Sequence, residues 1–320
     1  MKEITLSVWE DSNKRRILDF IHREITSIDL SEVLKTHLLE EIREPLKSAS
    51  YIIVAIQGPK MIGYICGNIH ETVGTATSIY VMPDVPERSA IVGSLTRELF
   101  KLMYTKSKLD VFEFVSPCFG QDYISEPLRM LGFMVTTHDE LLCEKPQIEK
   151  QTTIEGYTFV SWKPELESDA SLVIALSDLG EIDNKRELPE REPRQRWLGE
   201  MRETGKIDLT ESFMTMRGNR LVGAIIGCSS ETQGEVLAIS GFSGEDSFDI
   251  ERKLCELTLQ AFVKKGVKLF RCTLPKYRES TLCVFESIGF VKVAILPDAL
   301  LLSSDDAWGA LLDEVSTLTS

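Results

Sequence analysis

Apolar and polar residues alternate along the chain with two periods, and the same succession of periods occurs in both halves. Each half opens with a strand-like alternation, which ends at Trp9 in the first half and at Trp162 in the second. Apolar residues then recur every three or four positions, which predicts helices over 12–25 and 31–46 and, in the second half, over 167–179. The two halves therefore begin with the same elements.

Two glycine-spaced segments predict a β-hairpin in each half. The turns fall at Gly58 and Gly218, because glycine adopts a positive φ at little cost. Four glycines have a partner 160 positions later, which gives the pairs Gly58 with Gly218, Gly63 with Gly223, Gly67 with Gly227, and Gly74 with Gly234. A further strand follows each hairpin, over 75–82 and 235–242. We interpret the glycines as scaffold residues that serve turns, bulges and close packing.

Each half then continues with a helix, a strand, a short helix and a last strand. The apolar faces of the first helices are formed by Leu95, Leu99, Leu102 and Met103 and by Ile250, Leu254, Leu257 and Ala261. The next strands are predicted over 109–117 and 267–275. The short helices end at Gly132 and Gly289, where a helix C-cap favours glycine. Because the order repeats, we predict a tandem duplication.

The predicted fold is α/β (α+β), with one domain over 1–146 and a second over 147–303. Each domain is a mixed, mostly antiparallel sheet flanked by helices, and 320 residues are enough for two cores. The polar segment 144–156 is the predicted linker. A C-terminal helix over 304–320 presents an apolar face that either docks on its own chain or contacts a second copy in a homodimer. That face consists of Trp308, Leu311, Leu312 and Val315.

The composition is that of a soluble protein, with 43% hydrophobic and 27% charged residues. No apolar run approaches the roughly 18–20 residues of a membrane span, and the start lacks the apolar core of a signal peptide. We therefore expect a cytoplasmic protein that does not bind a membrane. The net charge of −14 argues against nucleic-acid binding, because the surface would repel phosphates. The acidity is compatible with an amine-bearing partner, and also with solubility alone.

The cysteine and histidine residues give no support for a disulfide framework or a metal site. The seven cysteines are widely spaced without a Cys-x-x-Cys pair, and the four histidines stand alone in the sequence. We expect buried or partly buried free thiols.

One loop carries a recognisable pattern. A predicted strand leads through Pro83 into "RSAIVG", residues 88–93, which opens the amphipathic helix. Together with the hairpin and strand before it and the helix after it, this segment resembles the GNAT superfamily of acyl-CoA-dependent N-acyltransferases. In that family the loop has the consensus sequence Gln/Arg-x-x-Gly-x-Gly/Ala. Arg88 and Gly93 match the pattern, whereas Ile91 replaces the middle glycine. The resemblance covers most of both halves in element order.

The resemblance implies a coenzyme A site in the first half. Free backbone N–H groups at a helix N-terminus can hold a pyrophosphate. The residues implied to hold it are Arg88, Ser89, Ala90, Ile91, Val92, Gly93 and Ser94. The backbone of Val81 and Met82 would hold the pantetheine arm as a pseudo-strand.

The second half departs from this pattern. Ser247 stands at the arginine position and Arg252 at the last glycine position. Glu245, Asp246 and Asp249 crowd the loop, and carboxylates at a helix N-terminus repel a pyrophosphate. We predict that this half does not bind coenzyme A in the usual way. It would instead support the first half or build a wall of the acceptor site.

The catalytic residues of the family are not matched. Many members use a tyrosine four residues before the Gly-Phe of the short helix, where this chain has Leu128 and Phe285. Three substitutes are candidates in the first half: Glu113, Cys118 and Tyr123. Each also has a structural interpretation, as an outward strand residue, a small core residue and a loop anchor respectively.

Two functions from different classes follow from the resemblance. The first is an N-acyltransferase, with acetyl-CoA or a related acyl-CoA as co-substrate and a small amine or a peptide as acceptor. The acyl group would move by direct attack of a primary amine in the first half. The alternative is a non-catalytic protein of the same fold that acts as a ligand sensor or an interaction scaffold. The sequence does not identify the acceptor.

Overall fold

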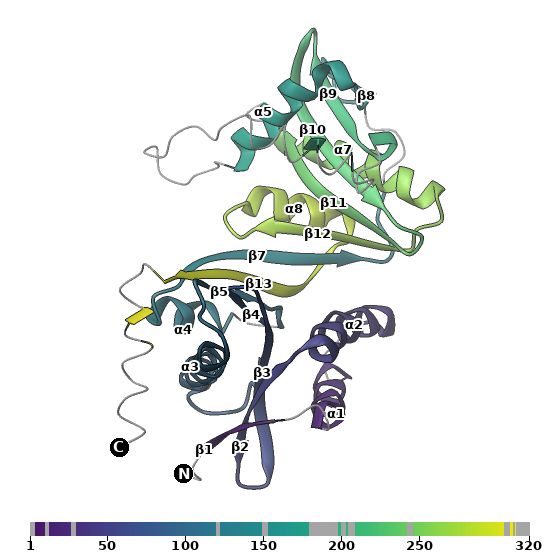
Figure 1. Ribbon diagram of the computed structural model, residues 1–320. Coiled ribbons are helices and arrows are strands. Elements are labelled where there is room, and N and C mark those ends of the chain that lie inside the picture. Colours follow the sequence, from purple (N-terminus) through teal and green to yellow (C-terminus); the bar gives the residue numbers. More distant parts are fainter. Residues whose placement is uncertain are drawn as a thin grey trace. The chain divides into compact units, whose positions relative to one another are not determined.

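The computed structural model describes residues 4–9, 13–26, 30–119, 122–148, 153–178, 198–199, 203, 209–241, 246–303, 308–309 and 311 (Figure 1). The chain forms two compact units. Unit 1 comprises residues 1–138 and 294–320, and unit 2 comprises residues 139–293. The predicted α/β class is confirmed, because each unit combines a mixed sheet with flanking helices.

Unit 1 is a mixed sheet with helices on both faces. Its strand order is β1-β2-β3-β4-β5-β13, in which only the β4–β5 pair is parallel. Helices α1 (Lys14–Thr26) and α2 (Glu32–Ser48) cover one face, and α3 (Arg88–Lys106) and α4 (Ser125–Met130) cover the other (Figure 1). The strands are β1 (Ile4–Val8), β2 (Tyr51–Gln57), β3 (Lys60–His70), β4 (Val73–Val81), β5 (Val111–Val115) and β13 (Val291–Leu302), and the short β6 (Cys118–Phe119) pairs with β13.

Unit 2 repeats this plan. The strand order is β7-β12-β11-β10-β9-β8, and the β11–β12 pair is parallel. Neighbouring residues of β10 point into separate cores, because Ile225 packs in the α7 cluster and Ile226 in the α5 cluster. The strands are β7 (Met134–Cys143), β8 (Thr158–Ser161), β9 (Phe213–Arg217), β10 (Arg220–Ser229), β11 (Gln233–Gly241) and β12 (Leu269–Pro275). The helices are α5 (Glu167–Asp178), α7 (Ser247–Lys264) and α8 (Glu279–Ile288), with 3₁₀ turns at Pro164–Leu166 and Leu209–Glu211.

The repeated glycines let a helix approach the hairpin in both units. A Cβ on Gly67 would overlap the Thr75 carbonyl oxygen and lie 2.8 Å from Met103 of α3. A Cβ on Gly227, its partner, would lie 2.7 Å from Thr258 of α7. The predicted scaffold role in close packing is therefore confirmed. Gly58 and Gly218 occupy the hairpin turns with φ of 62° and 58°.

Replacing Gly67 with alanine is expected to destabilise unit 1 by roughly 1–3 kcal/mol, because the added methyl meets backbone as well as a side chain. Urea unfolding of the full chain would measure the loss. The control is the equally small change Gly74→Ala, for which the three nearest atoms belong to the side chains of Leu109, Phe112 and Met103. Equal stability of the Gly67→Ala variant and the parent chain would contradict the packing role.

The last strands of the two halves are exchanged, which the sequence-based division did not anticipate. The C-terminal half of β13 pairs antiparallel with β5, from Asp298 opposite Val115 to Leu302 opposite Val111. The segment Asp139–Cys143 of β7 belongs to unit 2 instead, where Glu140 forms an ion pair with Arg271 of β12 at 2.8 Å. The boundaries of the units therefore differ from 1–146 and 147–303.

The predicted linker and C-terminal helix also have defined surroundings. The backbone N–H of Gln147 donates to the Ile288 carbonyl at 2.7 Å, so the described part of 144–156 packs within unit 2. Trp308 and Leu311 are buried in unit 1, and the Trp308 ring packs edge-on against Phe100 at 4.8 Å. Leu312 and Val315 lie outside the described residues.

The helical periodicity was predicted more accurately for α3 than for α7. Leu95, Leu99 and Met103 are buried as expected, whereas Leu102 is only half-buried. In α7 the buried face includes Leu259 and Phe262, whereas Leu257 and Ala261 are only half-buried. Both short helices end with a glycine of positive φ, 88° at Gly132 and 102° at Gly289, as predicted. No helix in the described part of the chain is long and apolar enough to cross a membrane.

Candidate active site

Strand β4 of unit 1 extends beyond the end of its parallel neighbour, β5. The β4–β5 ladder extends from Val73 opposite Val111 to Ala76 opposite Phe114, whereas β4 continues to Val81. A bulge at Thr77 marks the point of divergence. The last residues of β4 therefore have one backbone edge that β5 does not cover. We call this edge, from Thr77 to Val81, the β4 slot.

Val81 presents its backbone to the slot, and Met82 does not. The Met82 N–H donates to the Ile62 carbonyl of β3 at 2.9 Å, so its donor belongs to the β3 side of the strand. The Ile79 N–H faces the slot and donates to the buried Ser116 hydroxyl at 2.8 Å. Of the two residues predicted to hold pantetheine, only Val81 thus has an outward carbonyl in place.

Arg88 bridges the open end of the slot. Its Nε donates to the Val81 carbonyl at 2.8 Å. Its guanidinium carbon lies 3.2 Å from the ring centroid of Tyr123, a residue that is 7% exposed. The structure thus brings together three predicted site residues: Val81, Arg88 and Tyr123. A cation over an aromatic face is attracted by the ring quadrupole, which holds the guanidinium in this position.

The first turns of α3 provide an accessible helix N-terminus. Ser89, Ala90 and Ser94 are exposed, and a Cβ on Gly93 would have no atom within 4 Å. Ile91 is 4% exposed, because it points into the core rather than toward the loop surface. The isoleucine at the family's glycine position therefore leaves the outer face of the loop clear.

The side chain of the N-cap residue does not cap helix α3. Glu87 occupies the N-cap position with φ 60° and makes no side-chain hydrogen bond there, while its carbonyl accepts from Ala90 and Ile91. The first backbone donors of α3 therefore lack a side-chain cap and are suited to an anion. The same loop also carries Asp84 and Glu87, both exposed, which offset part of this positive field.

The other two catalytic candidates lie elsewhere. Glu113 is opposite Thr75, six residues before Val81 along β4, which places its backbone roughly 20 Å from the open end of the slot. Its side chain lies on the opposite face of β5 from the buried Phe112 and Phe114. The backbone of Cys118 pairs with that of Ile295, whereas the Cys118 side chain is not among the parts of the chain that the structure describes.

A contact between Glu24 and Tyr80 was not predicted from the sequence. The Tyr80 hydroxyl donates to Glu24 Oε2 at 3.0 Å. Burial raises the pKa of Tyr80 above its ordinary value, and the Glu24 carboxylate raises it further, so that the hydroxyl keeps its proton. The two residues are 56 positions apart, and Glu24 looks like an ordinary polar residue of an amphipathic helix.

The corresponding slot of unit 2 is filled by side chains. The β11–β12 ladder ends at Val236 opposite Cys272, while β11 continues to Gly241. Arg278 Nη1 donates to the Ile239 carbonyl at 2.7 Å, and the Gly241 N–H donates to Glu251 Oε1 at 3.1 Å. A buried arginine and a buried carboxylate therefore satisfy the strand edge that unit 1 leaves to Arg88.

This filling is internally paired. Arg278 Nη2 lies 3.0 Å from Glu251 Oε1, and the Thr281 hydroxyl donates to Glu251 Oε2 at 2.8 Å. All three residues are less than 9% exposed. Nearby, the Tyr157 hydroxyl donates to Asp246 at the start of α7, and Glu245 lies outside the described residues. We define Arg278, Glu251 and Thr281 as the unit 2 plug.

The plug gives unit 2 a specific pH dependence. Burial raises the pKa of Glu251 above its ordinary value of 4.5, although Arg278, Thr281 and the Gly241 N–H act in the opposite direction. The folded state therefore keeps this proton at pH values at which the unfolded chain has lost it. We expect the stability contributed by Glu251 to fall as the pH rises above about 4.5.

Urea unfolding of the parent chain and of Glu251→Gln across pH 4.5–7 would measure the pH-dependent stability that Glu251 contributes, since the glutamine cannot titrate. The difference in free energy of unfolding between them should decrease with pH. A difference that is constant or increases with pH would contradict the direction of the shift.

Comparison with solved structures identifies similar folds at low sequence identity. A GCN5-related N-acetyltransferase from Sphaerobacter thermophilus matches with a TM-score of 0.50 and 13% identity, over 93% of this chain and 95% of that one. A tandem GNAT protein from the clavulanic acid biosynthesis pathway, determined without AcCoA, matches with a TM-score of 0.48 and 10% identity, over 95% and 100%. No protein-family model and no curated protein matches the chain.

Proposed function

From the GNAT fold that occurs in tandem in this chain, we propose that the protein transfers an acetyl or related acyl group from acyl-CoA to a primary amine, and that unit 1 is the active unit. The observation that carries the proposal is the β4 slot, a strand edge that β5 leaves uncovered beyond Ala76 and that ends beside the uncapped start of α3. Such an edge can accept an extended chain by backbone hydrogen bonding.

Arg88 has two positions in this proposal. In the structure its Nε donates a hydrogen bond to the Val81 carbonyl. When acyl-CoA binds, the guanidinium turns outward to the pyrophosphate, together with the first amides of α3, and the Val81 carbonyl becomes available to the pantetheine amide. Arg88 is half-buried, so this movement exposes no deeply buried charge. Arg278 of the unit 2 plug does not move in this way, because it is 8% exposed and forms an ion pair with Glu251.

The transfer itself needs a neutral amine. Its nitrogen attacks the thioester carbonyl carbon, a C–N bond forms, and the C–S bond breaks. The amine nitrogen releases a proton and the departing thiolate gains one, which gives an amide and free coenzyme A. Tyr123, whose ring the Arg88 guanidinium covers in the structure, is our candidate for supplying the thiolate proton.

Release of free thiol from acetyl-CoA in the presence of primary amines tests the proposal. Amine-dependent release is expected, and Tyr123→Phe should lower kcat by about 10²-fold, a usual size for one general acid, with coenzyme A affinity retained. The absence of amine-dependent thiol release, with every amine tried and with coenzyme A bound, would refute the enzyme.

That negative result would favour a non-catalytic sensor of the same fold. The placement of Arg88 on the Val81 carbonyl and over Tyr123 is the observation that favours this alternative, since it closes the slot in the absence of ligand. Failure of coenzyme A to bind at all would leave the interaction scaffold.

A further inference from the structure

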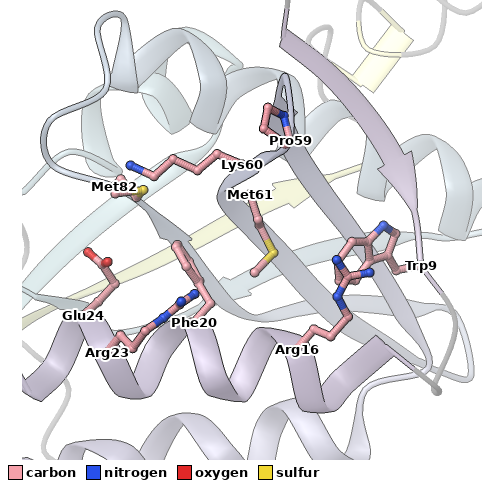
Figure 2. A pocket seen from close by; sticks show the side chains of 9 residues that line it. All are labelled: Trp9, Arg16, Phe20, Arg23, Glu24, Pro59, Lys60, Met61 and Met82. Atoms are coloured by element: carbon pink, nitrogen blue, oxygen red, sulfur yellow. The ribbon is translucent and has the colours of Figure 1, made fainter.

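A cavity of about 550 Å³ lies in unit 1 between α1 and the β2–β3 hairpin (Figure 2). Four of its residues come from α1 at positions 16, 20, 23 and 24, a spacing that places them on one side of the helix. The other lining residues are Trp9, Pro59, Lys60, Met61 and Met82. Its volume is in the range of small-molecule sites.

The cavity lining is cationic in an acidic protein. Arg16, Arg23 and Lys60 contribute positive charge and Glu24 the one carboxylate among the lining residues, whereas the chain as a whole carries −14. None of the three cations forms an ion pair with a carboxylate among the residues that the structure describes. Their charge is therefore available to an anionic ligand.

The two ends of the cavity differ chemically. Figure 2 shows Glu24, Met82 and the Lys60 ammonium toward one end, and Trp9 with Arg16 at the other. The Arg16 guanidinium lies 5.1 Å from the Trp9 ring centroid, which orients it. Along α1, Arg16 and Glu24 are eight residues apart, or about 12 Å. Apolar side chains, Phe20 and Met61, lie between the ends.

The carboxylate end adjoins the β4 slot. Glu24 accepts a hydrogen bond from Tyr80, which immediately precedes Val81 on β4, and Met82 follows Val81 directly. The Tyr80 ring packs edge-on against Phe20 at 5.7 Å, so α1 holds this end of the strand. A group bound at Glu24 therefore lies beside the β4 slot, in which the proposed function holds the acyl-CoA.

We propose that this cavity, which we call the α1 pocket, binds the acyl acceptor and that the acceptor is a small primary amine that also carries a carboxylate several bonds away. This inference rests on the proposed function. The ammonium group is held by Glu24, and the carboxylate is held by Arg16 at the opposite end (Figure 2). The aliphatic part of the acceptor lies against Phe20 and Met61.

The proton balance follows from this placement. Glu24 accepts one proton from the bound ammonium, and the neutral amine attacks the thioester carbonyl carbon. As the C–N bond forms and the C–S bond breaks, the nitrogen loses its second proton to solvent and the thiolate is protonated. Glu24 then returns its proton to solvent, so each turnover of an ammonium form releases one proton. Tyr80 keeps Glu24 oriented through its hydrogen bond.

Matched pairs of amines test the acceptor class. In the thiol-release assay, 6-aminohexanoate and L-phenylalanine are compared with 6-aminohexanamide and L-phenylalaninamide, which differ from them only by the neutral amide. We expect kcat/KM to be about tenfold higher for 6-aminohexanoate than for its amide. The phenylalanine pair, with amine and carboxylate on one carbon, should show a smaller preference.

Charge variants locate the preference in the α1 pocket. Arg16→Gln should raise KM for 6-aminohexanoate about fivefold and leave KM for the amide unchanged. Arg16 is the most direct single probe, because it is the cation at the end opposite Glu24 (Figure 2). Arg15→Gln is the control, an exposed α1 residue that makes the same charge change away from the pocket. Glu24→Gln should lower kcat for both members of each pair.

The outcomes separate the two proposals. Turnover with equal kcat/KM for acid and amide, or an Arg16→Gln effect no larger than that of Arg15→Gln, overturns the acceptor class and leaves acyl transfer intact. If no amine is acylated, calorimetry with 6-aminohexanoate alone decides. Binding that is weakened by Arg16→Gln and retained in Arg15→Gln supports an anion-binding α1 pocket, and no binding overturns it.

Discussion

Replacing Gly93 with aspartate is expected to weaken coenzyme A binding by about ten- to hundredfold. Gly93 lies in the second turn of α3, where a Cβ would have no atom within 4 Å, so the carboxylate is accommodated without disturbing the fold. Two unit charges at ~6 Å repel by about 1.4–2.8 kcal/mol when the effective dielectric constant is about 20–40. Each 1.4 kcal/mol corresponds to about tenfold in affinity. Calorimetric titration with coenzyme A measures the change.

The matched control is Gly93→Ala. Alanine fits the same open space and is the better helix former by about 1 kcal/mol, so the variant should be at least as stable as the parent chain. Without a charge, its coenzyme A affinity should stay within about twofold of the parent value. If the aspartate and alanine variants bind coenzyme A equally well, the α3 N-terminus does not hold the pyrophosphate.

Replacing Glu251 with alanine is expected to destabilise unit 2 by about 3–5 kcal/mol. The change leaves Arg278 buried without its carboxylate, and breaking a buried ion pair on one side costs more than the pair itself contributes. The Gly241 N–H and the Thr281 hydroxyl lose their acceptor as well. Urea unfolding of the full chain would measure the loss in free energy of unfolding. Amide hydrogen exchange in β11 would show that the loss is in unit 2.

The double variant Glu251→Leu with Arg278→Met is the control for this prediction. It removes both charges and keeps apolar volume, so it should cost clearly less than the sum of the two single changes. A single Glu251→Ala change that costs under about 1 kcal/mol would show that the plug is not an integral part of unit 2.

Much of the fold could be predicted because its signals are local. The hairpin turns at Gly58 and Gly218, the helix ends at Gly132 and Gly289, and the two periods of apolar residues each depend on a few adjacent positions. The exchange of β7 and β13 could not be predicted. Either last strand has an alternating pattern that suits the same edge, and nothing in the order of elements selects between β5 and β12.

The candidate site likewise has one part that could be predicted from local sequence and another that could not. The position of the α3 start, at Arg88, was predictable from its place after a hairpin and a strand. The inward turn of Arg88 onto Val81 and Tyr123 was not, since it depends on how far β4 outruns β5. Glu24 meets Tyr80 from 56 residues away, and Arg278 meets Glu251 from 27, so neither pair leaves a local motif.

The central claim is that acyl-CoA binds along the β4 slot of unit 1 and is excluded from the plugged slot of unit 2. Amide hydrogen exchange of the full chain, with and without coenzyme A, tests this most directly because it reports each strand edge separately. We predict increased protection in peptides that cover Ile79–Ser94 and no change in those that cover Ile239–Gly241 or Ser247–Arg252. Protection in the unit 2 peptides, or none at Ile79–Ser94 with saturating coenzyme A, would contradict it.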